Sequence, residues 1–245
     1  MLLSLSYQEF PNDSITALFD KILKVAYLKR VKTVPGALQY LEVSKPAAII
    51  VTDEGIANKE NSIVLERVKA YIESGGTVIV GLHFPHFIKR DAFNYFFQDV
   101  FGLPWCAENF HRDNCYINPS CTLPSTVEAK SMPERYFCII KVLNISGARN
   151  HEKLFIPIQM CVTYPMVFTQ EWLDQSEAGI VGAKIGAGYL AFVGDVNVED
   201  ETSQIIMVLC GLEVPVEDRQ PAAQGVGRRE WSVFSEDHCR LDEWF

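Results

Sequence analysis

Residues 47–81 read AAIIVTDEGIANKENSIVLERVKAYIESGGTVIVG, and this stretch decides the fold class. It opens with a continuous apolar run, 47–52, which is typical of a strand that is covered on both faces of a parallel sheet. Residues 62–73 carry apolar side chains at helical spacing, and a glycine pair follows as a helix stop. The second apolar run, 77–81, predicts another buried strand. Such strand–helix–strand units pair in parallel with a right-handed crossover.

The same patterns predict further elements on both sides of this unit. We expect helices over 15–28, from Pro35 onward, over 91–100 and over 201–212, strands over 2–7, 137–143 and 153–168, and a hairpin of 180–184 with 189–193. The sequence therefore predicts one α/β domain over residues 1–214, a three-layer sandwich with a mostly parallel central sheet. Residues 102–135 are rich in proline and cysteine and predict an irregular excursion with one or two short strands. Residues 215–245 lack periodicity and predict a C-terminal tail.

Composition and charge exclude several classes of function. The 245 residues are 48% hydrophobic and carry a net charge of -9, which gives no electrostatic reason to bind nucleic acid or an anionic membrane. No apolar run has the length of a membrane span, and the first residues do not resemble a secretion signal. The seven cysteines are an odd number and are most simply reduced thiols. We therefore expect a cytoplasmic or nuclear protein.

Two stretches resemble a known family. One is AAIIVTDEGI followed, after a helix, by ESGGTVIVGLHFPHF, and the other is GAKIGAGYLAFVGDVNVEDETSQIIMVLCGL. Together they resemble the class I glutamine amidotransferase-like superfamily, with its flavodoxin-like sheet, and especially its divergent ThuA-like members. In that family the strand after the glycine pair enters a G-x-C-x-G nucleophile elbow, and the later hairpin ends at a catalytic histidine. The resemblance covers residues 1–100 and 178–212.

This chain departs from the family at both catalytic positions. His83 stands where the family has its cysteine nucleophile, and Pro85 replaces the second glycine of the elbow. Asp195 stands where the catalytic histidine is expected. The resemblance therefore implies a scaffold without the Cys/His pair that activates a thiol, and we expect no amidotransferase activity.

Polar side chains follow three of the predicted strands. Ligands of parallel α/β sheets bind beyond the carboxyl ends of the strands, so these residues are candidates for a small-molecule or metal site. The other reading is that they only cap neighbouring segments, as Asp195 would for the helix near Glu201. No further histidine at metal-ligand spacing accompanies the pair His83 and His86, so we expect no metal there. The candidates are Asp53, Glu54, His83, His86, Asp195 and Asn197.

Two other motifs have simpler explanations. Cys106, His111, Cys115 and Cys121 lie close in sequence but lack a C-x-x-C pair, so reduced thiols are favoured over a zinc site. The turn Gly186-Ala187-Gly188 lacks the helix of a phosphate-binding loop and fits a hairpin. We therefore expect no cofactor.

Three hypotheses about function follow. The first is a non-catalytic binding or protein-interaction module. The second is a hydrolase or isomerase of altered chemistry that uses His83 as a base with Asp195 or Asp53 as its partner. The third is a subunit of an oligomer that is held by the aromatic segment 93–101 or by the tail. The aromatic residues of the tail would dock in a partner's groove or pack on their own domain and cover an edge strand; they are Trp231, Phe234, Trp244 and Phe245.

Overall fold

The computed structural model describes residues 1–6, 13–112, 114–138, 141–157, 162–163, 171–172 and 176–214. The predicted tail over 215–245 lies outside these residues. So do most of the predicted strand 153–168 and two of the seven cysteines, Cys161 and Cys239.

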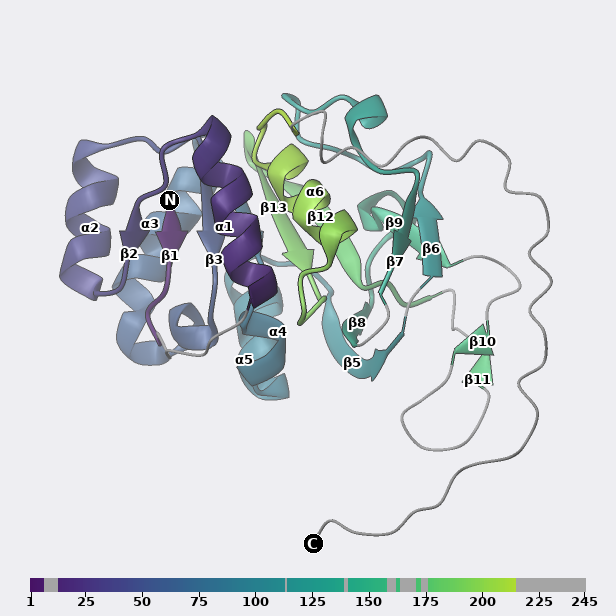
Figure 1. Cartoon of the computed structure of the whole chain (residues 1–245). Helices are drawn as coiled ribbons and strands as arrows, with labels where there is room; N and C mark the ends of the chain where they lie inside the picture. The colour runs from purple at the N-terminus through teal and green to yellow at the C-terminus, as the bar shows by residue number, and fades with distance from the viewer. Residues whose placement is uncertain are drawn as a thin grey trace, which may run out of the picture.

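A six-stranded sheet forms the centre of the fold, in the order β12-β13-β4-β3-β1-β2 (Figure 1). Its strands are β1 (Leu2–Leu3), β2 (Arg30–Val31), β3 (Ala48–Val51), β4 (Thr77–Val80), β12 (Ile180–Ile185) and β13 (Gly188–Val193). Neighbouring strands from β2 to β13 are parallel, and β12 is antiparallel to β13. The predicted hairpin is confirmed. The unit of β3, helix α3 (Ser62–Glu73) and β4 is confirmed as well.

Alternate side chains of this sheet pack into two separate cores. Ile49 and Val51 of β3 belong to one core, whereas Ile50 and its neighbour Leu2 on β1 belong to the other. The first core also receives α2 (Val34–Val43), α3 and α5 (Arg90–Asn94), and the second receives α1 (Asp13–Val25) and α6 (Asp200–Leu209). Figure 1 shows α1 and α6 on the same side of the sheet. Because helices cover both faces, these strands are apolar throughout.

Local signals set the helix ends. The hydroxyl of Thr33 accepts a hydrogen bond from the backbone N–H of Gly36 at 3.3 Å and so caps the start of α2. After α3 the chain turns at Gly75, whose φ of 103° lies in the left-handed region that favours glycine. None of the helices in the described ranges is long and apolar enough to cross a membrane.

The aromatic segment after β4 belongs to the interior. It forms α4 (Phe84–Phe87), α5 and a π-helical turn (Tyr95–Val100). The rings of Phe93 and Phe97 lie 5.3 and 5.7 Å from the ring of Phe192 on β13, and all three side chains are fully buried. The predicted oligomer interface over 93–101 is therefore wrong, because its rings are part of the chain's own core.

Residues 106–172 add three small antiparallel sheets. Their strands are β5 (Cys106–His111), β6 (Asn114–Ile117), β7 (Arg135–Phe137), β8 (Val142–Ser146), β9 (Phe155–Pro157), β10 (Val162–Thr163) and β11 (Glu171–Trp172). The sheets are β5-β8, β7-β6-β9 and β10-β11. In Figure 1 the sheet β7-β6-β9 lies beyond α6, on the opposite side from α1.

The predicted fold class, a three-layer sandwich around a mostly parallel sheet, is wrong. Seven of the thirteen strands among the described residues lie outside the central sheet, in antiparallel sheets, and the central sheet is itself mixed. The chain is a mixed α/β protein. Residues 102–135 contain two short strands, β5 and β6, in agreement with the expected excursion. Both strands are short and only partly buried, so they lack the continuous apolar run that indicates a parallel strand.

Replacing Phe192 with alanine tests the aromatic core. We expect Phe192→Ala to lower the free energy of unfolding by about 3–5 kcal/mol, because the ring is fully buried against Phe84, Phe93 and Phe97. Urea denaturation measures the change. Tyr27→Ala is the matched control: its side chain is 84% exposed, so the change should stay within about 0.5 kcal/mol. Equal losses in the two variants would contradict this packing.

Candidate functional site at the carboxyl ends of the strands

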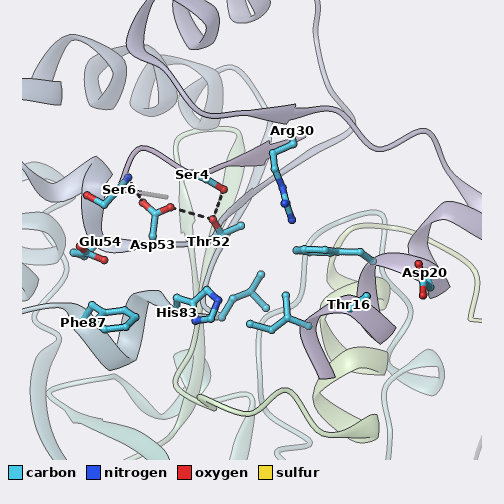
Figure 2. A pocket seen from close by; sticks show the side chains of 13 residues that line it. Ser4, Ser6, Thr16, Asp20, Arg30, Thr52, Asp53, Glu54, His83 and Phe87 are labelled. Atoms are coloured by element: carbon cyan, nitrogen blue, oxygen red, sulfur yellow. Dashed lines mark hydrogen bonds between the residues drawn. The ribbon is translucent and has the colours of Figure 1, made fainter. Parts of the chain in front are cut away.

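A cavity of about 330 Å³ lies beyond the carboxyl ends of β1, β3 and β4, between the sheet and α1 (Figure 2). This is the edge at which parallel sheets bind ligands, and the volume suits a small molecule. Polar and apolar side chains share its wall. The lining residues are Ser4, Ser6, Ile15, Thr16, Phe19, Asp20, Arg30, Thr52, Asp53, Glu54, Leu82, His83 and Phe87.

The alternation of the strands explains why hydroxyl groups line the cavity. Ser4 and Thr52 lie two residues beyond Leu2 and Ile50, so they share the sheet face that α1 covers. Their hydroxyl oxygens are 2.6 Å apart and join the ends of two neighbouring strands. From α1, residues one helical turn apart such as Ile15 and Phe19 complete this side of the cavity.

The carboxylate of Asp53 connects the segments that follow β1 and β3. Its Oδ1 accepts hydrogen bonds from the backbone N–H groups of Ser6 at 2.9 Å and Gly55 at 3.1 Å, and its Oδ2 accepts one from the Thr52 hydroxyl at 3.3 Å. Only glycine fits at position 55, because a Cβ there would lie 2.4 Å from the Ser6 nitrogen. Burial raises the pKa of Asp53, and these hydrogen bonds offset part of that rise.

Glu54 and Arg30 bring opposite charges to the cavity. Burial raises the pKa of Glu54, and the neighbouring Asp53 charge raises it further. The guanidinium carbon of Arg30, on β2, lies 4.9 Å from the centre of the Phe19 ring, a distance typical of a cation–π contact. In Figure 2 Arg30 and Asp53 lie on either side of Thr52. A ligand would therefore meet carboxylate acceptors on one side and a guanidinium donor on the other.

His83 enters the cavity from the turn after β4. The backbone of this turn is strained at Leu82, the residue before His83. Its φ of 63° is unusual for a residue other than glycine. The His83 backbone N–H donates to the Thr52 carbonyl at 3.0 Å and ties the turn to the end of β3. Burial lowers the pKa of the half-buried His83 ring, the Asp53 charge opposes that shift, and the His86 and Arg30 charges add to it.

The structure brings together half of the residues that the sequence proposed for this edge. Asp53, Glu54 and His83 line the cavity, whereas His86, Asp195 and Asn197 do not. His86 is exposed and stacks edge-on against Phe87, with 4.6 Å between ring centres. The expectation that all three strand ends contribute to one site is wrong. Asp195, which follows β13, is buried, and neither it nor Asn197 lines the cavity.

Asp195 performs a structural task at that third strand end. Its side chain is 0% exposed, and its Oδ1 accepts a hydrogen bond from the backbone N–H of Asn197 at 2.9 Å. Its Oδ2 accepts from the backbone N–H of Glu199 at 3.2 Å and from the hydroxyl of Thr202 at 2.5 Å. The carboxylate therefore fixes the turn that leads from β13 into α6, which is the capping role that the sequence also allowed.

The cysteine and histidine residues do not gather. Within the described part of the chain, no three His, Cys, Asp or Glu side chains are placed to share a metal ion. Cys106, Cys115 and Cys121 form no disulfide, and the imidazole of His111 lies 4.0 Å from the carboxylate of Glu177. The turn Gly186-Ala187 joins β12 to β13, as predicted for a hairpin.

Sequence reasoning missed most of the cavity wall. Ser4 and Ser6 follow a strand end, as Asp53 does, so the same rule could have found them. No such signal marks the other wall residues. Arg30 begins β2, and Thr16 and Phe19 belong to α1, so they reach the cavity only through tertiary packing.

Comparison with known proteins bears on the fold alone. No family model matches the sequence, and no curated protein matches it. Among solved structures, the chain is similar to the β-galactosidase from Bacillus circulans sp. alkalophilus, with a TM-score of 0.50 and 15% sequence identity. The match covers 82% of this chain and 27% of that one, so this chain spans about a quarter of the length of that enzyme. At 15% identity the likeness concerns the fold alone.

The titration of His83 tests the arrangement of charges in the cavity. Arg30→Gln removes a positive charge that disfavours protonation, so the pKa of His83 should rise. Asp53→Asn removes a negative charge that favours protonation, so the same pKa should fall. NMR titration of the ring measures both shifts. Lys59→Gln, at an exposed position outside the cavity, should leave the pKa unchanged. Shifts of the same sign in the two cavity variants would contradict this geometry.

The structural role of Asp195 predicts a loss of stability. Asp195→Ala leaves the buried hydroxyl of Thr202 and the part-buried N–H groups of Asn197 and Glu199 without this acceptor, so the free energy of unfolding should fall by about 2–3 kcal/mol. Urea denaturation measures the loss, and Asp99→Ala, at an exposed position, is the control. A wild-type stability in Asp195→Ala would be inconsistent with this role.

Proposed function

We propose that this chain is a non-catalytic binding module that takes up a small polar molecule in the cavity beyond β1, β3 and β4. The observation that carries this proposal is the make-up of the wall. Asp53 and Glu54 supply carboxylates, Arg30 supplies a guanidinium, and Ser4 and Thr52 supply hydroxyls around about 330 Å³ of space. Such a concave site with a few convergent polar groups on an apolar background is typical of a ligand pocket.

The state of the polar groups favours binding over reaction. The Asp53 carboxylate is held by the Ser6 and Gly55 backbone and by the Thr52 hydroxyl, so the fold already uses three of its acceptor sites. Asp195 is enclosed in its own hydrogen bonds and is absent from the wall. The cysteine and histidine of the amidotransferase-like pattern are replaced by His83 and Asp195. Relationship to that superfamily and its ThuA-like members remains part of the proposal, on the sequence pattern alone.

A second candidate is a hydrolase or isomerase that uses His83 as a base. One observation favours it: His83 and Asp53 share the cavity, and the lowered pKa of His83 keeps the imidazole neutral and able to accept a proton. Asp53 would then be the partner in place of Asp195. Perturbed pKa values gathered in one cleft often accompany catalysis, although buried structural groups produce them as well.

We also propose a cytoplasmic or nuclear location. None of the five cysteines in the described ranges forms a disulfide, which fits a reducing compartment. The partner would be a small molecule in this cavity or a protein at another surface, and the acidic charge of the chain disfavours nucleic acid and anionic membranes.

Blocking the cavity tests the proposed function. Ligand-observed NMR with a library of small polar compounds should find binders to the wild-type chain. These compounds should no longer bind to Thr16→Trp, because an indole on this face of α1 occupies the cavity. Ala17→Trp is the matched control, since it places the same ring at the next, exposed position of the helix outside the wall. Arg30→Gln should weaken the binding of anionic compounds in particular.

Two results would count against this proposal. One is a wild-type chain that binds none of the compounds, and the other is binding that survives Thr16→Trp. Consumption of a bound compound by the wild-type chain, but not by His83→Gln, would instead favour the hydrolase or isomerase.

A further inference from the structure

The sheet β7-β6-β9 has one covered face and one open face. Cys115, Tyr136 and Phe155 point into the core that α6 shares, and all three are buried. The opposite side chains form what we call the outer face: Tyr116, Arg135, Phe137 and Ile156. Tyr116 pairs directly with Arg135 on β7 and with Ile156 on β9, so the three strands place these groups side by side.

Apolar and cationic groups meet on this outer face. Phe137 is 47% exposed and Tyr116 is 36% exposed, and the two positions are diagonal neighbours across β7 and β6. The exposed Arg135 pairs directly with Tyr116 and lies two residues before Phe137 on β7. Two exposed aromatic rings beside a guanidinium suit a partner that carries aromatic and acidic side chains together.

The chain carries such a segment beyond its described part. Residues 230–245 read EWSVFSEDHCRLDEWF. They hold the aromatic residues Trp231, Phe234, Trp244 and Phe245, and their acidic residues far outnumber the single Arg240. The aromatic residues of this segment suit the exposed rings of the outer face. Its acidic residues have the opposite charge to Arg135.

The position of the last described residues makes the contact reachable. Val214 is buried in the same core as Tyr136 of β7, and it follows α6, which contacts β7. In the described part of the chain β7 is an edge strand, with β6 as its sheet neighbour on one side. The 17 residues from Val214 to Trp231 can span up to about 55 Å when extended, several times the roughly 10 Å thickness of a sheet layer.

We propose that residues 230–245 dock within the same molecule on the outer face of β7-β6-β9. Their aromatic side chains pack on Tyr116 and Phe137, and their carboxylates pair with Arg135. The contact covers the exposed rings and the open edge of β7, which would otherwise invite association with other chains. It is separate from the cavity, so it stands or falls independently of ligand binding.

Hydrogen exchange of the full chain tests this contact. Amides of residues 230–245 should exchange at least about tenfold more slowly than unstructured references, at the same rate in concentrated and in dilute protein. The double variant Tyr116→Ser/Phe137→Ser should lose this protection, and Arg135→Glu should reduce it. The matched control Tyr27→Ser/Val43→Ser changes one exposed aromatic and one exposed aliphatic residue outside the outer face and should retain it. Protection of the β4 and β13 amides reports that each variant is folded.

Three results would overturn the proposal. Unprotected amides over 230–245 in the wild-type chain would show that the segment does not dock. Protection that survives both Tyr116→Ser/Phe137→Ser and Arg135→Glu would place the segment on another surface. Protection that disappears on dilution would mean that the segment binds a second copy of the chain.

Discussion

The carboxylate of Asp53 is the constraint on which the site depends. It accepts hydrogen bonds from backbone that follows β1 and from backbone that follows β3, and so holds two neighbouring strand ends in one geometry. The hydroxyls of Thr52 and Ser4 continue this network across the sheet. A buried carboxylate is costly to ionise, and the raised pKa of Asp53 is a sign of that cost. The hydrogen bonds from Ser6, Gly55 and Thr52 offset part of that cost.

The parts of the fold that the sequence predicted share one physical cause. The runs around Ile50 and Ile79 are apolar throughout because helices cover both faces of the central sheet, and such runs are visible without a structure. The position of Asp53, Glu54 and His83 followed from the same runs, since polar residues after buried strands gather at one edge. The continuous apolar runs in the sequence therefore predicted one side of the cavity.

The remaining parts depend on packing that leaves no local pattern. Strands such as β6 and β7 are short and only partly buried, so the antiparallel sheets left no clear pattern and the fold class was predicted wrongly. The strand expected over 137–143 is instead divided between β7 and β8. Arg30 and Phe19 come from a strand start and a helix face, and they meet only in the tertiary structure. Asp195 resembled a site residue by position, yet its carboxylate turns inward toward Thr202. A position at a strand end makes a residue a candidate for the binding site. Its hydrogen bonds in the folded chain show whether its role is structural.

The central claim is that the cavity beyond β1, β3 and β4 is a binding site. The most direct measurement is a crystal structure of the full chain with a small polar compound bound. We predict density for the compound between Arg30 and Asp53, in contact with the Thr52 hydroxyl. A compound bound at another surface, with the His83 and Phe87 side chains filling the cavity, would contradict the claim.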